Sequence, residues 1–227
     1  MVRNRRFALV FRVGAFLFSL LGLLSHLGIF SGKLSLGILM YYTVQSNILG
    51  VVMFAVLALY TARGLRKEGA KGSAGYLPRF EMVCVIDLLL TLLVYWVMLA
   101  PQSFSMTSSY SLFSFDNLAV HLITPLLCMA DYVLFTESGH LRYADVWAVL
   151  IFPLFYVAFS SAAGFLGYVY RVRENGVPVR FPYFFIDYDQ VGVFAVAYIG
   201  GLFAFFLLLS HLLYCLDKKV KKPVLLA

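Results

Sequence analysis

The chain has 227 residues, of which 62% are hydrophobic and only 13% are charged, and its formal net charge is +7. A soluble domain of this length needs a charged surface that this composition does not supply. We therefore expect an all-α integral membrane protein, and we expect the positive charge to set its orientation in the membrane rather than to bind nucleic acid.

Six stretches are apolar enough to cross a bilayer, which takes about 20 apolar residues. The segments between them are too short to fold independently. We therefore predict one transmembrane domain over residues 1–227, with six helical spans at 7–29, 36–62, 80–100, 117–135, 144–166 and 191–216.

The basic residues predict how this polytopic bundle is oriented. Lys and Arg collect in cytoplasmic loops, and here they are concentrated near both termini and in the 63–79 loop. The opposite side carries only Lys33, Arg171, Arg173 and Arg180. We therefore expect both termini to face the cytoplasm, with the chain in the cell membrane if it is bacterial.

The second span carries one polar stripe, because Thr43, Ser46, Asn47 and Gly50 are spaced i, i+3, i+4 and i+7 on a helix. Hydrocarbon penalises polar groups unless they face the interior of the bundle. This stripe is therefore predicted to point inward.

The fourth span repeats the pattern, with Asn117, His121, Thr124, Cys128 and Asp131 on one face. Counted at 1.5 Å per residue from the outer end, the second span places its threonine about 10 Å deep and the fourth places its histidine about 6 Å deep. A hydroxyl and an imidazole can thus meet in the outer third of the bundle.

If Thr43 and His121 act as a pair, the reaction class would be acyl transfer. A threonine hydroxyl is a poor nucleophile until an adjacent base takes its proton, and histidine is the usual base near neutral pH. Asn47 is the first candidate for stabilising the oxyanion, with Ser46 and Asn117 as supporting groups.

Two further assignments concern charged and aromatic residues. We expect Arg12 to pair with Asp87 in the inner half of the bundle, with Asp131 as the alternative partner. Four groups could orient His121, and the sequence does not choose among them: Asp116, Tyr95, Tyr198 and Asp187. His26, near the outer end of the first span, could line the same pocket or lie at the interface.

Other functions are compatible with these stripes. They could serve helix packing in a non-catalytic scaffold, or form the path of a small transporter or channel. A haem-binding electron carrier is less favoured, because no two spans each offer two histidines at matched depth. The sequence shows no Cys/His cluster with zinc spacing, so it indicates no metal and no cofactor.

Three segments resemble one known family. YYTVQSN at 41–47 and NLAVHLITPLL at 117–127 are similar to the threonine and histidine segments of the family of the androgen-induced protein and the androgen-dependent TFPI-regulating protein. FPYFFIDYDQVG at 181–192 resembles the family's Tyr-Pro-Phe-Leu type motif, although Phe184 stands at the usual proline position. The chain thus looks like a bacterial-type relative of these membrane threonine hydrolases.

The resemblance implies that Thr43 is the nucleophile and His121 the general base in an intramembrane hydrolase. The implied substrates are fatty acid esters of hydroxy fatty acids or similar lipid esters, so membrane lipids are the expected partners. The ester would enter laterally between helices. The aromatic loop at 167–190, with Tyr183 and Asp187, would cap the outer mouth of the pocket.

Overall fold

The computed structural model describes residues 1–101, 111–173 and 175–219. It is all-α apart from one short hairpin, and it contains six helices that are long and apolar enough to cross a membrane. These helices are Arg5–His26, Tyr42–Glu68, Pro78–Leu99, Phe115–Phe135, Asp145–Phe165 and Phe194–Lys219.

Several spans are composites of shorter elements. The first two and the last are α1 (Arg5–His26), α2 (Tyr42–Glu68) and α10 (Phe194–Lys219). The third, fourth and fifth spans join α3 (Pro78–Val94) to η2 (Tyr95–Leu99), α5 (Phe115–Leu118) to η3 (Ala119–Ile123) and α6 (Thr124–Phe135), and α7 (Asp145–Ala148) to α8 (Ile151–Phe165).

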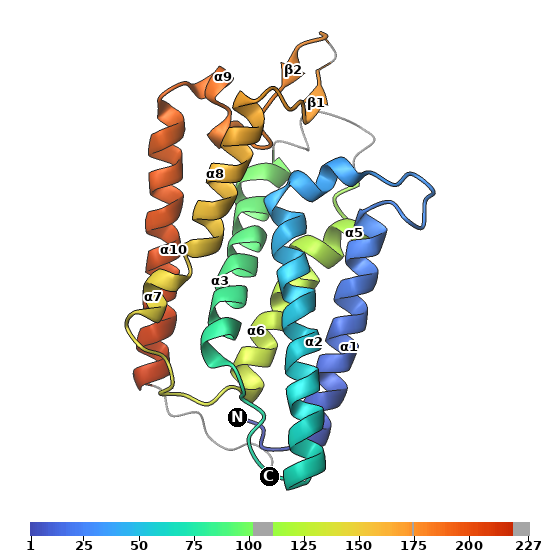
Figure 1. The fold of residues 1–227 in the computed structure, drawn as a ribbon, viewed down its shortest axis with the longest axis vertical. Coiled ribbons are helices and arrows are strands. Elements are labelled where there is room, and N and C mark those ends of the chain that lie inside the picture. The colour runs from blue at the N-terminus through green and yellow to red at the C-terminus, as the bar shows by residue number, and fades with distance from the viewer. Residues whose placement is uncertain (102–110, 174, 220–227) are drawn as a thin grey trace.

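Short elements gather at one end of the bundle (Figure 1). They are η1 (Leu36–Met40), the antiparallel hairpin of β1 (Arg171–Val172) and β2 (Pro178–Val179), η4 (Phe184–Ile186) and α9 (Tyr188–Val191). We call this the outer end, following the orientation expected from the charges, and the opposite end the inner end. α1 begins and α10 finishes at the inner end.

The second spanning helix begins at Tyr42, later than the predicted 36. Leu36–Met40 forms a separate 3-10 turn, and Tyr41 follows it with an extended backbone at φ −90° and ψ 142°. The helix then continues to Glu68, beyond the predicted 62, and stops at Gly69, whose φ of +81° is one that glycine readily adopts.

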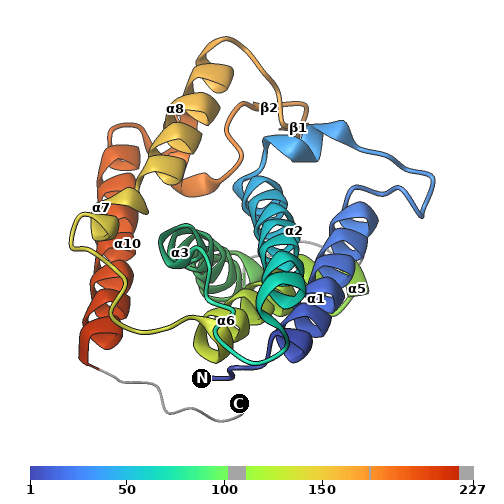
Figure 2. The same ribbon diagram turned by 60° about the horizontal axis from the view of Figure 1, so that its bottom comes forward.

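The helices form two groups around α3. Figure 2, which brings the inner end forward, shows α1, α2, α3 and α6 packed together, with α8 and α10 on the other side of α3. α1 lies against α2 and α6, and α3 in turn packs against α2, α6 and α10. A cavity described below lies between α2, α3, α8 and α10.

A buried ion pair joins the helices in the inner half. The Arg12 guanidinium, fully buried, donates from Nε to Asp131 Oδ1 at 2.8 Å and from Nη2 to Asp131 Oδ2 at 2.7 Å. Its Nη1 donates to Thr61 Oγ1 at 2.6 Å and to the Ala74 carbonyl at 2.8 Å. One side chain thus bridges α1, α2, α6 and the loop that precedes α3.

The expected pairing of Arg12 with Asp87 is wrong, and the alternative partner, Asp131, is correct. Asp87 instead accepts a hydrogen bond from the Tyr42 hydroxyl at 2.9 Å. The reason is position: α6 lies beside α1, whereas α3 lies farther away (Figure 2). The Arg12 side chain also tilts toward the helix N-terminus, which is the inner end, and so toward the level of Asp131.

This pair gives a stability prediction. Arg12→Met would leave Asp131 buried without its cation, and we expect the free energy of unfolding to fall by about 3–5 kcal/mol. Cys84 and Cys128 are buried and free, so thermal unfolding in detergent can be followed with a thiol-reactive dye.

The matched control is Glu137→Gln, which removes the exposed Arg3–Glu137 pair of 3.2 Å. An exposed pair contributes about 1 kcal/mol or less, so this variant should unfold close to the parent temperature. Equal shifts in the two variants would contradict the importance of the buried pair.

Candidate functional site

Both polar stripes face the interior of the bundle, as the sequence predicts. In α2, Thr43 is 8% exposed, while Ser46 and Asn47 are fully buried. In the fourth span, Asn117 is 1% and His121 is 5% exposed. The inward orientation predicted from helical spacing is therefore confirmed.

Asn47 brings the two stripes to a common level. Its Nδ2 donates to the Thr43 carbonyl at 2.8 Å and, across the helix interface, to the Val120 carbonyl at 3.0 Å. Thr43 lies one turn from Asn47, and His121 directly follows Val120, so the hydroxyl and the imidazole sit within about one helical turn of each other in depth. In the described residues no hydrogen bond joins the Thr43 hydroxyl to the His121 ring.

The His121 ring is held in one orientation. Its Nδ1 lies 3.1 Å from the Asn117 carbonyl oxygen. A carbonyl oxygen only accepts, so Nδ1 carries the hydrogen and the neutral ring keeps its lone pair at Nε2. Tyr95 stacks on the ring with centroids 3.6 Å apart and an interplanar angle of 19°. His121 thus has the tautomer that a base acting through Nε2 requires.

Two π-helical turns place this pair. Tyr95 begins η2, and His121 lies at the centre of η3. Pro125 has no N–H, so it cannot donate to the His121 carbonyl as an α-helix would require. The Trp96 indole Nε1 donates to that carbonyl instead, at 3.2 Å. π-helical turns are rare and frequent at functional sites, and here the two turns meet at the histidine.

His26 and Asp116 lie behind the histidine. His26 Nδ1 is 3.3 Å from Asp116 Oδ2, and the His26 ring meets His121 edge-on with centroids 5.9 Å apart. Asp116 therefore contacts His26 rather than His121 directly. Among the four candidates for orienting His121, Tyr95 is the one that touches its ring, and the Asn117 carbonyl supplies the hydrogen bond.

The other two candidates lie in or near the outer loop. Asp187 is 2% exposed, lies 3.7 Å from the Arg173 guanidinium and accepts from the Asp189 N–H at 3.1 Å. Tyr198 on α10 faces Phe184, with ring centroids 6.0 Å apart. These contacts fasten the loop to itself and to α10, away from His121.

A mainly apolar cavity reaches Thr43. It lies between α2, α3, α8, α10 and the 183–186 segment, and its empty space, counted with the open mouth, is about 590 Å³. Its hydroxyl-bearing lining residues are Tyr42, Thr43, Thr91, Tyr95, Tyr156 and Tyr183, and most of the remaining wall is aliphatic and aromatic.

His121 is not a lining residue in this structure. Tyr95, which stacks on its ring, forms that part of the wall. Thr43 thus lines the cavity, and the histidine lies behind the Tyr95 ring.

The Tyr183 phenol lies against Thr43. Burial raises the pKa of the Tyr183 phenol to about 12, and hydrogen-bonding contact with Thr43 opposes part of that rise. The phenol therefore keeps its proton at neutral pH. Sequence reasoning assigned Tyr183 to a lid and did not find its contact with Thr43.

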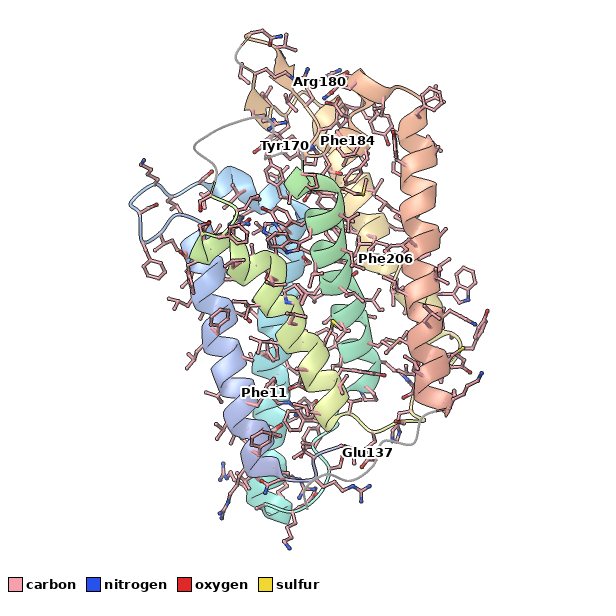
Figure 3. All side chains as sticks on the ribbon, turned by 180° about the vertical axis from the view of Figure 1, so that it is seen from behind. Phe11, Glu137, Tyr170, Arg180, Phe184 and Phe206 are labelled. Carbon is pink, nitrogen blue, oxygen red and sulfur yellow. The ribbon has the colours of Figure 1, made fainter. Side chains whose placement is uncertain are left out.

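Other aromatic residues lie near this end of the bundle. Figure 3 shows Phe184 and Tyr170 gathered at the outer end and Phe206 between α10 and α3.

The three expected supporting residues all bridge helices or loops. Both amide hydrogens of Asn47 are engaged, as described above. The Ser46 hydroxyl donates to the Thr43 carbonyl at 3.0 Å and lies 2.9 Å from Thr91 Oγ1. Asn117 Nδ2 donates to the Leu112 carbonyl at 2.7 Å. An oxyanion role for Asn47 would require one of its bonds to break, whereas Tyr183 already faces the cavity.

The described residues contain no group of three or more His, Cys, Asp or Glu side chains that could hold a metal ion. Comparison of the chain with protein-family models, with curated proteins and with solved structures gives no match. The function is therefore argued from the site itself.

The hydrogen bond from His121 to Asn117 predicts the histidine tautomer. In ¹⁵N-histidine NMR of the purified protein, we expect the His121 signals to show a protonated Nδ1 and an unprotonated Nε2. The signals are assigned by their loss in His121→Ala. A protonated Nε2 with a bare Nδ1 would contradict this geometry.

Proposed function

We propose that the chain is an intramembrane hydrolase of lipid esters, such as fatty acid esters of hydroxy fatty acids, with Thr43 as nucleophile and His121 as general base. The observation that carries this proposal is the position of Thr43, which lines an apolar cavity at the level of a histidine whose Nε2 keeps its lone pair. The likeness of the 41–47 and 117–127 segments to membrane threonine hydrolases supports the same assignment.

The first half of the reaction acylates the enzyme. Thr43 Oγ1 attacks the ester carbonyl carbon while His121 Nε2 takes the hydroxyl proton. The tetrahedral intermediate then collapses, the bond from the carbonyl carbon to the alcohol oxygen breaks, and His121 returns its proton to the departing alkoxide. An acyl-threonine and a free alcohol result.

The second half regenerates the enzyme. His121 Nε2 takes a proton from water as the water oxygen attacks the acyl carbon. The bond from that carbon to Thr43 Oγ1 breaks, and His121 gives the proton to Oγ1. The free fatty acid leaves, and both residues return to their starting states.

Tyr183 is assigned the oxyanion. A preorganised donor helps when it points to where negative charge develops, and the Tyr183 phenol is protonated, partly buried and in contact with Thr43. Its place on the outer loop also makes it part of the cap over the cavity. Loop docking and transition-state stabilisation are thus coupled in one residue.

Closure of the dyad requires a small rearrangement. Tyr95 must move from its stacked position on the face of the His121 ring so that Nε2 can approach Thr43 Oγ1. Catalytic hydrogen bonds are often long or unformed without substrate and tighten in the Michaelis complex. We further propose that the inner end, where α1 begins and α10 finishes, faces the cytoplasm, because the flanking segments are basic.

A fluorophosphonate probe tests the nucleophile. Labelling of the detergent-purified protein is expected to be abolished by Thr43→Ala and His121→Ala and retained by Thr43→Ser. Thr91→Ala is the matched control, because Thr91 is another threonine that lines the same cavity, and it should label like the parent. Failure of the folded parent to label would favour the transporter or scaffold readings.

The oxyanion assignment predicts a selective loss of turnover. Removing one such donor costs about 10²–10³ in kcat, so Tyr183→Phe should lower kcat for a p-nitrophenyl fatty acyl ester by that factor. Tyr156→Phe is the control, because Tyr156 lines the cavity but donates to the Met40 carbonyl at 3.1 Å. Equal kcat values in the two variants would reject the role of Tyr183.

A further inference from the structure

A second hollow lies on the outside of the bundle, next to the cavity. It is lined by Met98 of η2 and by Phe194, Ala197, Tyr198, Gly201 and Leu202 of α10. Leu202 also lines the cavity that reaches Thr43. One leucine side chain therefore forms part of the wall of both spaces.

The outer half of α10 is held differently from the inner half. In the inner half, Ser210 Oγ donates to the Val146 carbonyl at 3.1 Å, and Asp217 Oδ2 accepts from the Leu141 N–H at 3.2 Å. Within the described residues, the outer half makes apolar and aromatic side-chain contacts, such as Tyr198 against Phe184. Lipid tails are as apolar as such side chains, so these contacts gain little over lipid. The polar contacts that anchor α10 thus lie in its inner half, and apolar contacts hold its outer half beside η2.

The lining of the hollow is chemically uniform. It contains no charged residue, and its only side-chain heteroatoms are the Tyr198 hydroxyl oxygen and the Met98 sulfur. The groove is open at Gly201, where an added Cβ would meet no atom within 4 Å. A groove of this kind, between two spanning helices, suits a linear hydrocarbon and offers nothing to hold a polar or charged solute.

We propose that this groove binds one acyl chain of a membrane lipid and is the lateral entrance through which the chain reaches the cavity, past Leu202. The entrance lies between η2 and the outer half of α10. The inference rests on the proposed function only in taking this acyl chain to be part of the ester substrate. Binding of the acyl chain itself does not require Thr43.

Binding of cis-parinaric acid, a fluorescent fatty acid, tests the groove without any hydrolysis. The background variant is Trp147→Phe, which leaves Trp96 of η2 as the energy donor close to Met98. Titration of the detergent-purified protein should give saturable energy transfer from Trp96. Gly201→Phe fills the groove and should weaken binding by about tenfold or more.

The matched control is Gly200→Phe. Gly200 is also exposed on α10 and also has no atom within 4 Å of an added Cβ, but it lines neither space. The Gly200→Phe variant should bind cis-parinaric acid with a dissociation constant within about twofold of that of the background variant. Three results would contradict acyl-chain binding in the groove: absence of energy transfer, unchanged binding in Gly201→Phe, or equal losses of affinity in the two glycine variants.

The result is separable from the hydrolase proposal. Thr43→Ala should bind cis-parinaric acid like the background variant, because the hydroxyl plays no part in holding the chain. Saturable binding that is lost only in Gly201→Phe supports the groove, even if the fluorophosphonate fails to label the parent.

Discussion

The structure depends on one constraint: polar groups in hydrocarbon must find partners within the protein. In the inner half, the Arg12 guanidinium meets it by binding Asp131, Thr61 and the Ala74 carbonyl. In the outer half, Asn47 meets it by donating across the interface to the Val120 carbonyl. These two sets of bonds fix the relative positions of α1, α2 and the fourth span.

The site follows from the same requirement. Pro125 deprives the His121 carbonyl of its usual helical donor, and the Trp96 indole supplies one from the neighbouring span. That contact brings η2 beside η3, which lets Tyr95 stack on the imidazole. The Asn117 carbonyl then sets the tautomer. A proline four residues after the histidine thus has consequences for the ring itself.

Spans and inward stripes could be predicted from sequence, because hydropathy and helical spacing are local properties. The approximate level of Thr43 and His121 was predicted by counting rise per residue, but the count for Thr43 assumed a helix from residue 36, whereas α2 begins at Tyr42. The partner of Arg12 was misjudged because the choice depends on which helices are neighbours. The Tyr95 stack depends on π-helical turns, and the contact of Tyr183 with Thr43 depends on how the outer loop docks. Neither feature can be predicted from the local pattern of a single sequence. The lipid-ester substrate stays a prediction from family resemblance.

The central claim is that Thr43 becomes acylated. The most direct test is to mix the purified protein with p-nitrophenyl palmitate, quench in acid during the first turnover and map the acylated peptide by mass spectrometry. The account predicts one palmitoyl group on Thr43 and none in Thr43→Ala. Turnover of the ester with the acyl group on another residue, or with no acylated residue, would contradict it.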